Sequence, residues 1–296
     1  MPASRRSFLT GLAAGCLLPG HCLAASGDAR RVASLDYGLA NTLLSLGQPP
    51  IAVAAADSWS EWVVEPPLPQ GVVDLGTDRE INMERLTALA PDLILTTPYV
   101  QGLRGRLEEV APVLTYSIYD QDKQPYRKAR EATRDLGRKL ECREAAAQLL
   151  DSTDSFFARL ATQDRNRPSG PLLLLRFMDA RHVRVYGKGS LFDDIMTQIG
   201  LANAWQGSTN AWGFQTVGIE QLAEAAGPET RIFTFEPLPG EVRPTLEESP
   251  LWTRLPAVKA GRFSVLPAVL MFGMLPSALR FARILSAHLG EDGHEG

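Results

Sequence analysis

The stretch from Tyr126 to Arg167 constrains the fold of this chain more than any other. It contains no proline and a single glycine, Gly137, and it is dense in good helix formers and in charges of both signs. Because proline breaks the interior of a helix, its absence over such a length favours helix. We expect a helical strut between two lobes, with residues 143–166 as the connecting helix. Unbroken, that helix would be about 35 Å long.

Short apolar runs alternate with Gly/Pro-rich turns on both sides of this strut. In the first half, Asp92 to Thr97 is the clearest buried strand, and Asn82 is placed to cap a helix from Met83 to Leu89. Strands and helices that alternate at short spacing predict a mostly parallel sheet covered on both faces. We therefore expect an α/β protein with two Rossmann-like lobes, residues 30–142 and 167–296.

The second lobe shows the same alternation. Ser190 opens a predicted helix, with Asp193 placed as in an acidic variant of the capping box. Residues 201–213 are expected to form a loop and residues 219–226 a helix. The remaining strands are predicted at 172–177, 183–186, 230–235 and 263–266, and a closing amphipathic helix is predicted at 276–289.

The N-terminal segment has the pattern of an export signal. Residues 4–10 form a twin-arginine pattern, an apolar run follows at 12–18, and two alanines suited to cleavage end the segment. We expect a signal peptide over residues 1–25 and a periplasmic protein. The apolar run is too short for a transmembrane helix, which needs about 20 residues. A lipid-anchored form through Cys16 is the second alternative.

The bulk composition excludes several kinds of chemistry. A net charge of -4 argues against nucleic-acid binding, which favours a basic patch. Cys142 is the only cysteine beyond the signal, so no internal disulfide can form. No His, Cys and carboxylate cluster has metal-ligand spacing, and neither a phosphate-binding loop nor a nucleophile elbow occurs. We expect no metal held by protein side chains, no cofactor and no enzymatic activity.

Aromatic and arginine residues on loops are the strongest functional candidates. In open α/β sheets, ligands bind beyond the carboxyl ends of the strands. Four such residues follow predicted strands or lie in long loops, namely Arg79, Tyr99, Trp212 and Phe272. For each residue alone, ordinary packing at the surface or in the core explains its presence about as well as a role in ligand binding does. Together they suggest a cleft for a bulky, partly apolar ligand with an oxygen-rich face.

Several segments closely resemble those of one protein family. The most specific are Trp62–Pro69, Asn203–Gly207, Asn210–Gly213, Pro250–Trp252 and Ala260–Phe263. From about Val32 to the closing helix, the chain resembles the ferric-hydroxamate (ferrichrome-type) siderophore-binding proteins of bacterial ABC importers. The resemblance implies a class III periplasmic binding protein fold, in which one long helix joins two lobes. It also implies that the siderophore carries the iron and that the protein contacts the chelate.

The resemblance places ligand contacts on the first lobe. In the family, an arginine and a tyrosine of this lobe donate to the iron-bound hydroxamate oxygens. Tyr99 matches the tyrosine after a one-residue gap. The register of the arginine falls at Asp78, and we assign its role to Arg79, one position later. Tyr37 and Trp62 match aromatic positions of the same lobe.

The second lobe matches the family pocket less uniformly. Trp212 matches a tryptophan that packs on the ligand. Another pocket tryptophan of the family falls at Leu270, and Phe272 stands two residues on, where the family has an aromatic residue. Arg184 replaces an apolar pocket position. These changes imply a different ligand preference, towards a more acidic or more polar siderophore.

The resemblance also implies a docking partner. In related binding proteins, a glutamate on each lobe reaches arginines of the membrane permease, and Glu84 and Glu220 occupy those positions. Each is also placed as a helix N-terminal carboxylate favoured by the helix dipole, and this simpler explanation stays open. We expect a monomer that docks on the inner-membrane permease.

The sequence thus predicts a periplasmic protein that binds ferric hydroxamates and delivers them to an ABC importer. One alternative keeps the fold and changes the ligand to cobalamin, haem or another siderophore class. A further alternative, from a different class of protein, is an exported enzyme that acts on the chelate.

Overall fold

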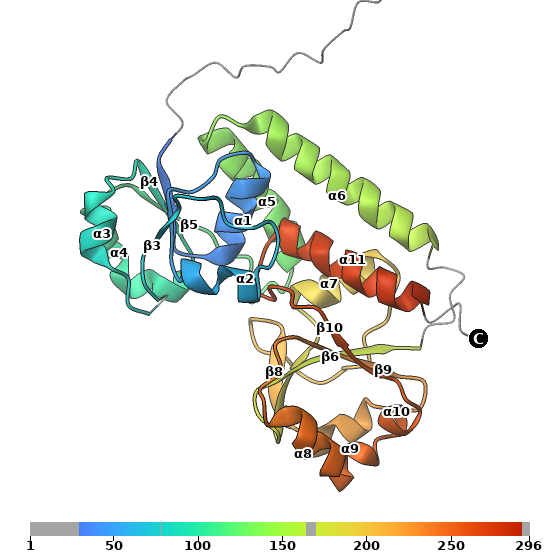
Figure 1. The fold of residues 1–296 in the computed structure, drawn as a ribbon. Coiled ribbons are helices and arrows are strands. Elements are labelled where there is room, and N and C mark those ends of the chain that lie inside the picture. Colours follow the sequence, from blue (N-terminus) through green and yellow to red (C-terminus); the bar gives the residue numbers. More distant parts are fainter. Residues whose placement is uncertain (1–29, 78, 164–169, 292–296) are drawn as a thin grey trace, which may run out of the picture.

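Two α/β lobes lie one above the other in the computed structural model, which describes residues 30–77, 79–163 and 170–291 (Figure 1). A long helix, α6 (Arg143–Gln163), runs along one side of the molecule. The predicted architecture of two lobes and a connecting helix is confirmed. The predicted signal peptide over residues 1–25, with Cys16, and the last residues of the predicted helix, 164–166, lie outside the described residues.

The N-terminal lobe is built on a parallel sheet with the strand order β3-β2-β1-β4-β5. Its strands are β1 (Val32–Ser34), β2 (Ala52–Val53), β3 (Val73–Asp74), β4 (Leu93–Thr96) and β5 (Val113–Thr115). Its helices are α1 (Tyr37–Ser45), η1 (Ala56–Ser58), α2 (Trp59–Trp62), α3 (Met83–Ala88), η2 (Pro98–Leu103), α4 (Arg104–Glu108) and α5 (Pro125–Lys139). The parallel order brings the carboxyl ends of these strands to one edge of the sheet.

The C-terminal lobe holds a mixed sheet with the strand order β10-β9-β6-β7-β8. The pairs β10–β9 and β9–β6 are parallel, whereas β6–β7 and β7–β8 are antiparallel. Its strands are β6 (Leu172–Phe177), β7 (His182–Tyr186), β8 (Phe214–Gly218), β9 (Arg231–Phe235) and β10 (Phe263–Leu266). Its helices are α7 (Leu191–Gln198), η4 (Ile219–Glu224), α8 (Val242–Glu248), α9 (Pro250–Thr253), α10 (Pro256–Lys259) and α11 (Leu275–Glu291).

Side-chain caps fix where three of the helices begin. The Asp36 carboxylate accepts from Leu39 N at 2.9 Å at the start of α1. Asn82 caps α3, as predicted, and Ser190 Oγ accepts from Asp193 N at 3.1 Å at the start of α7. Only half of the predicted capping box forms, because the Asp193 carboxylate accepts from Asn203 Nδ2 at 2.8 Å. Such caps satisfy backbone donors that the first turn of a helix leaves unpaired.

Gly137 explains how α5 and α6 pack together. A Cβ added at Gly137 would lie 2.5 Å from the Cβ of Ala146, so only glycine permits this approach of the two helices. The buried face of α6 carries Ala146, Leu150, Phe157 and Leu160. No helix in the described part of the chain is long and apolar enough to cross a membrane.

One hydrophobic core runs from the first lobe into the second. It includes Leu39 and Leu43 of α1, Phe192 of α7, and Phe281 of α11, together with buried residues of α5 and α6. Helix α11 contacts α1, α5, α6 and α7, so it packs on both lobes. The lobes are therefore joined by shared packing along α11 as well as by α6.

The segment after the predicted loop 201–213 differs from expectation. Residues 214–218 form strand β8, which pairs antiparallel with β7, and the following helix is the short 3-10 helix η4 rather than a helix over residues 219–226. Strand β8 lies at an edge of its sheet and buries only Val217 fully, so it lacks the apolar run that marks a central strand.

Candidate ligand-binding site

Three aromatic rings from distant parts of the chain meet where the two lobes face each other. Tyr119, which follows β5, stacks on Trp212 with ring centroids 5.6 Å apart and an interplanar angle of 27°. Phe272, which follows β10, meets both rings edge-on at 5.8 Å and 5.4 Å. Tyr119 also donates its hydroxyl hydrogen to Met271 O at 2.8 Å. The N-terminal lobe thus supplies one ring of this aromatic cluster and the C-terminal lobe two.

Arg184 of β7 lies beside the aromatic cluster. Its guanidinium carbon is 4.2 Å from the centre of the Phe214 ring and 5.8 Å from that of Phe272. Its Nη1 points at the sulfur of Met271 at 3.8 Å, which is a weak acceptor. Its Nε is buried and has no hydrogen-bond partner among the described residues. A cation that lies over aromatic faces and keeps a buried donor without an acceptor is suited to an oxygen-bearing ligand.

Two further predicted site residues, Tyr37 of α1 and Trp62 of α2, belong to the N-terminal lobe. The Tyr37 hydroxyl donates to Ala55 O, and its ring meets Trp59 edge-on at 5.7 Å. The ring of Trp62 lies 4.4 Å from the guanidinium carbon of Arg176, a residue of β6 in the other lobe. Trp62 and Arg176 therefore form a second contact between the lobes.

Tyr99 and Arg79 are placed on exposed segments of the N-terminal lobe. Tyr99 lies in η2, directly after β4, and is 53% exposed. Arg79 is exposed on the turn after β3. Within the described residues Tyr99 makes no ring contact with the aromatic cluster. The structure therefore brings Arg184, Trp212 and Phe272 together, whereas Tyr99 and Arg79 lie exposed after β4 and β3 of the N-terminal sheet.

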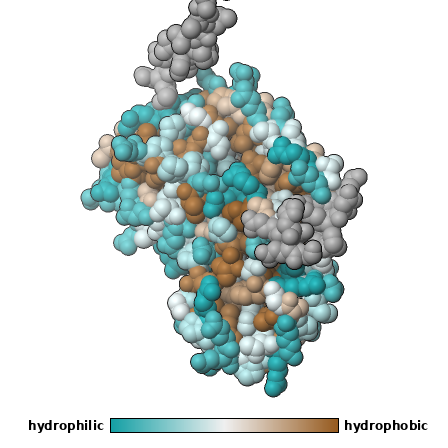
Figure 2. Space-filling model, turned by 45° about the vertical axis from the view of Figure 1, so that its right-hand side comes forward, coloured by the Kyte–Doolittle hydropathy of each residue, from teal (hydrophilic) through white to brown (hydrophobic). Residues whose placement is uncertain are grey.

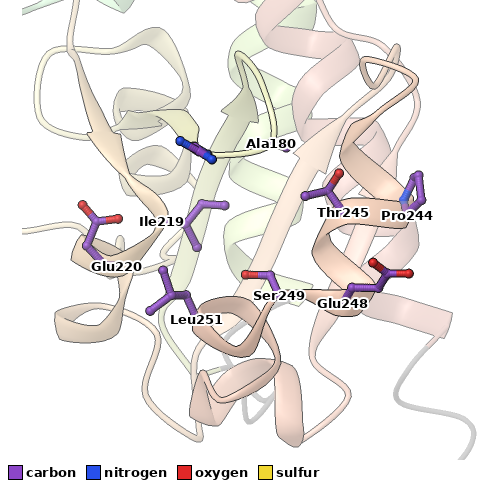
Figure 3. A pocket seen from close by; sticks show the side chains of 9 residues that line it. Ala180, Ile219, Glu220, Pro244, Thr245, Glu248, Ser249 and Leu251 are labelled. Atoms are coloured by element: carbon purple, nitrogen blue, oxygen red, sulfur yellow. The ribbon is translucent and has the colours of Figure 1, made fainter.

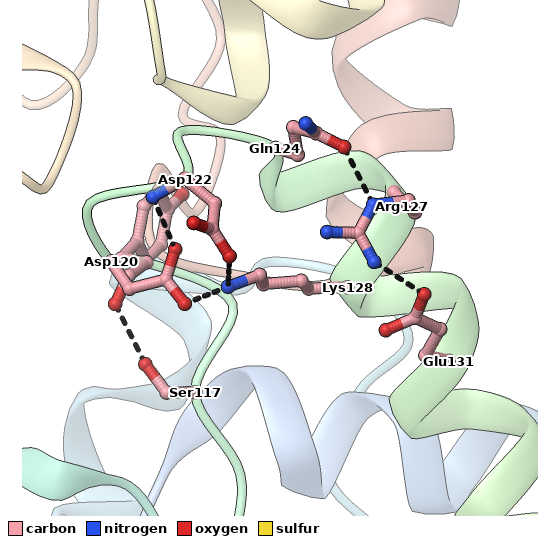
Figure 4. Close-up of polar contacts among 8 residues, drawn as sticks. Ser117, Asp120, Asp122, Gln124, Arg127, Lys128 and Glu131 are labelled. Carbon is pink, nitrogen blue, oxygen red and sulfur yellow. Dashed lines mark hydrogen bonds and ion pairs between the residues drawn. The ribbon is translucent and has the colours of Figure 1, made fainter.

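Polar contacts hold the loop that carries Tyr119 (Figure 4). Lys128 of α5 pairs with Asp120 and, at 3.1 Å, with Asp122. Ser117 Oγ donates to Tyr119 O at 2.8 Å. We call residues 117–124 the bridging loop, because Lys123 of this loop reaches the other lobe. Its Nζ donates to Thr209 O at 2.8 Å and to Thr209 Oγ1 at 2.9 Å.

Electrostatics keep the buried phenols of this region as hydrogen-bond donors. Burial raises the pKa of Tyr119 well above its usual range, and the neighbouring Tyr186 raises it further. Burial likewise raises the pKa of Tyr186, although the Arg184 and Arg176 charges oppose the shift. The Tyr186 hydroxyl donates to the sulfur of Met271. Both phenols therefore stay protonated at neutral pH.

The sequence did not single out Tyr119, Phe214, Met271 or Arg176, although all four border this region. Tyr119 could have been found, because it follows strand β5 of the N-terminal sheet much as Tyr99 follows β4. Arg176 lies inside a predicted strand, where an arginine is unusual enough to mark a functional position. Phe214 was not identified because strand β8, which begins at this residue, was not predicted from the sequence.

Hydrophobic surface gathers where the two lobes meet (Figure 2). Trp212 is 38% exposed and Tyr99 is more exposed still, so both offer aromatic surface to a ligand. Among the described residues, no group of three or more His, Cys, Asp or Glu side chains could hold a metal ion. The groups that the region offers are thus aromatic faces, phenols and guanidinium donors.

A separate recess of about 580 Å³ lies within the C-terminal lobe, away from the aromatic cluster (Figure 3). Its lining residues come from the β6–β7 turn, η4, α8 and α9, and include Ile219, Glu220, Thr245, Glu248 and Leu251. None of the residues predicted to bind the ligand lines it. Glu220 lies at one side of this outer recess, and the predicted docking residue on the other lobe, Glu84, is exposed in the first turn of α3.

Comparisons with known proteins agree with this fold. Residues 32–270 match the family described as periplasmic binding protein. The iron(3+)-hydroxamate-binding protein FhuD of Escherichia coli (strain K12) is 35% identical over 289 residues, which cover 97% of this chain and 97% of that protein. The match therefore extends through both lobes.

Solved structures share the fold. The siderophore binding protein FhuD from Vibrio cholerae, bound to Fe3+-Desferal, is similar with a TM-score of 0.82 at 26% identity, over 88% of this chain and 98% of that one. FhuD2 from Staphylococcus aureus with bound ferrioxamine B has a TM-score of 0.70 at 20% identity, over 88% and 98% of the two chains. The two lobes, the connecting helix and the full-length match together show that the chain belongs to the periplasmic binding protein family.

Proposed function

We propose that this protein binds ferric hydroxamate siderophores in the periplasm and delivers them to an ABC importer of the inner membrane for iron uptake. The observation that carries the proposal is the aromatic cluster, to which both lobes contribute and beside which the buried Nε of Arg184 has no acceptor among the described residues. A full-length relative that is named for iron(3+)-hydroxamate binding supports the same ligand class. The chain acts by binding and release rather than by catalysis.

The residues take distinct roles in this proposal. Tyr99 and Arg79 donate hydrogen bonds to the iron-bound hydroxamate oxygens from the N-terminal lobe. Trp212 and Phe272 pack against the organic backbone of the siderophore from the C-terminal lobe. Charge-assisted hydrogen bonds to anionic oxygens are among the strongest that proteins form, whereas aromatic faces tolerate varied backbones around one chelate. Iron remains cargo that the siderophore holds.

Export and docking complete the proposal. The twin-arginine signal over residues 1–25 directs the chain to the periplasm, where it works as a monomer. Glu84 and Glu220 then face arginines of the permease. Glu220 is exposed, and its carboxylate lies over Gly218, where an added Cβ would clash with a carboxylate oxygen. Both glutamates start a helix on the surface of their own lobe.

Titration of tryptophan fluorescence tests the binding step. Adding ferrichrome or ferrioxamine B to the purified protein should quench the fluorescence with dissociation constants on the order of micromolar or below. The iron-free siderophores serve as controls, and cobalamin and haem as competing chelates. Absence of quenching with every ferric hydroxamate, or tighter binding of cobalamin or haem, would overturn the proposal.

A further inference from the structure

Two arginines stand side by side on the C-terminal sheet. Arg176 of β6 and Arg184 of β7 are directly opposed in the antiparallel register. Directly opposed residues of an antiparallel pair point to the same face of the sheet. Like charges in such positions destabilise the pair. The repulsion between the two guanidinium groups therefore lowers the stability of the folded protein, and packing of the sheet does not explain why both are arginine.

The two arginine side chains lie on the face of the C-terminal sheet that is turned towards the N-terminal lobe. Arg176 lies over the ring of Trp62, a residue of the N-terminal lobe. Arg184 lies over Phe214 and near Phe272, which belongs to the aromatic cluster. The arginine pair thus borders the proposed siderophore site.

Neither arginine forms an ion pair with a carboxylate in the described part of the chain. The Nε of Arg184 is buried and has no acceptor among the described residues. Its Nη1 points at the sulfur of Met271 at 3.8 Å, and its side chain also hydrogen-bonds to the Tyr186 hydroxyl oxygen. Arg176 is half-buried, and the carboxylate of Glu61 acts on it only through its charge at longer range. Two half-buried cations without an anion between them are costly to keep.

The pKa of Arg176 reflects the burial and the mutual repulsion of the two arginines. Burial lowers the pKa of Arg176, and the neighbouring charge of Arg184 lowers it further, although Tyr186 and Glu61 oppose this. Arginine nevertheless stays charged in proteins. An anion placed between the two guanidinium groups would reduce their repulsion and accept hydrogen bonds from them.

We propose, on the basis of the proposed function, that Arg176 and Arg184 form a subsite for a carboxylate carried by the siderophore. The guanidinium fork matches the geometry of a carboxylate, and two forks can bind its two oxygens. The aromatic cluster beside it packs on the rest of the ligand. The protein therefore selects ferric hydroxamates that bear a free carboxylate over uncharged ones.

A matched pair of ligands isolates this selectivity. Ferrioxamine B acylated at its free amine with an acetyl or a succinyl group gives two ligands that share one ferric trihydroxamate and differ by a carboxylate. The wild-type protein should bind the succinyl form roughly tenfold or more tightly, as expected for a charge-assisted contact. In Arg184→Leu and in Arg176→Met the ratio of the two dissociation constants should fall towards about one. Arg254→Leu, which removes an exposed arginine elsewhere on the same lobe, should keep the wild-type ratio.

The outcomes separate this inference from the proposed function. If neither ligand binds, the proposed function fails. If both bind with the same ratio in the wild type and in both variants, the arginine pair is not a carboxylate subsite. Should one variant fail to fold, the other variant still tests the arginine pair, and equal affinity of the wild-type protein for the two ligands would by itself contradict the inference. Added salt should erode the succinyl advantage, because a gain that survives high salt unchanged does not come from charge.

Discussion

Trp212 and Tyr99 expose aromatic surface that a soluble protein normally buries or covers. Trp212 is held in place by its stack on Tyr119 and its edge contact with Phe272. Tyr99 follows the buried strand β4 and is held by the backbone of η2. Rings that are fixed at the backbone but open to solvent are suited to a ligand that covers them.

Truncating either ring should weaken siderophore binding. Trp212→Ala and Tyr99→Ala should each cost roughly 1–3 kcal/mol of binding free energy, the scale of a lost aromatic or charge-assisted contact. Isothermal titration with ferrioxamine B measures the loss. Leu251→Ala, which removes an exposed apolar side chain from the outer recess, should leave the affinity unchanged. The opposite pattern, with loss only in the Leu251 variant, would place the ligand in the outer recess.

Asp36 should make stability depend on pH. Burial raises its pKa from 3.8 to about 6, although the backbone N–H groups of Leu39 and Gly38 favour the charged form. The folded state then takes up a proton at a higher pH than the unfolded state does. The stability gained appears as the pH falls through about 6 and stops growing near 3.8.

Asp36→Asn keeps an acceptor for Leu39 N and removes this titration. Between about pH 7.5 and about pH 5, the free energy of unfolding of the wild type should rise by about 1 kcal/mol relative to the variant, since the side chain keeps some contact with solvent. Denaturant unfolding at both pH values measures the difference. The exposed carboxylate of Asp151 on α6 provides the control, Asp151→Asn. Equal pH dependence in the wild type and Asp36→Asn would contradict the argument.

At the scale of elements, the bridging loop determines how the aromatic cluster is assembled. Lys128 is 14% exposed and joins Asp120 and Asp122, and Lys123 binds Thr209 of the other lobe. The loop therefore holds Tyr119 against Trp212 from one side while it ties the lobes together.

Lys128→Met should loosen this loop. It leaves two carboxylates without their cation, and we expect a loss of about 1–2 kcal/mol in stability and a several-fold weaker siderophore affinity. Hydrogen exchange of residues 117–124 should become faster. Lys139→Met, at the exposed end of α5, is the matched control. Unchanged exchange and affinity in Lys128→Met would show that the loop holds its position without this ion pair.

Much of the element order could be read from the sequence. Helix α6 follows from a long stretch without proline, and strands β4, β6 and β9 follow from continuous apolar runs. Strand β8 was missed because a short edge strand depends on its partner β7 rather than on its own pattern. Propensity and periodicity report on local structure, whereas an edge pairing is a tertiary contact.

The site was only partly predictable for a related reason. Residues at strand ends can be found one lobe at a time, which is how Tyr99, Trp212 and Phe272 were singled out. The stack of Tyr119 on Trp212 and the contact of Arg176 with Trp62 depend on how the two lobes are placed relative to each other. A single sequence does not encode that placement in any local pattern.

At the scale of the whole molecule, the proposed docking residues lie apart from the proposed ligand site. Glu84 and Glu220 are exposed on separate lobes, and neither contacts the aromatic cluster. A permease that binds both glutamates at once would sense how the lobes are placed relative to each other. The shared core along α11 fixes that placement.

The double variant Glu84→Ala, Glu220→Ala should therefore abolish siderophore-dependent iron uptake and keep the wild-type affinity for ferrioxamine B. Uptake of radiolabelled iron in cells that lack other hydroxamate transporters measures transport, and fluorescence titration measures binding. Glu144→Ala with Glu247→Ala, which removes exposed carboxylates from α6 and α8, is the control. Normal uptake by the docking variant would leave the two glutamates only the role of helix N-terminal carboxylates favoured by the helix dipole.

The position of bound iron tests the account most directly. Crystals grown with ferrioxamine B should show one anomalous iron peak between the lobes, beside the aromatic cluster of Tyr119, Trp212 and Phe272 and within reach of Tyr99. An iron peak in the outer recess near Thr245 and Leu251, or protein crystals without bound iron at saturating ligand, would contradict it.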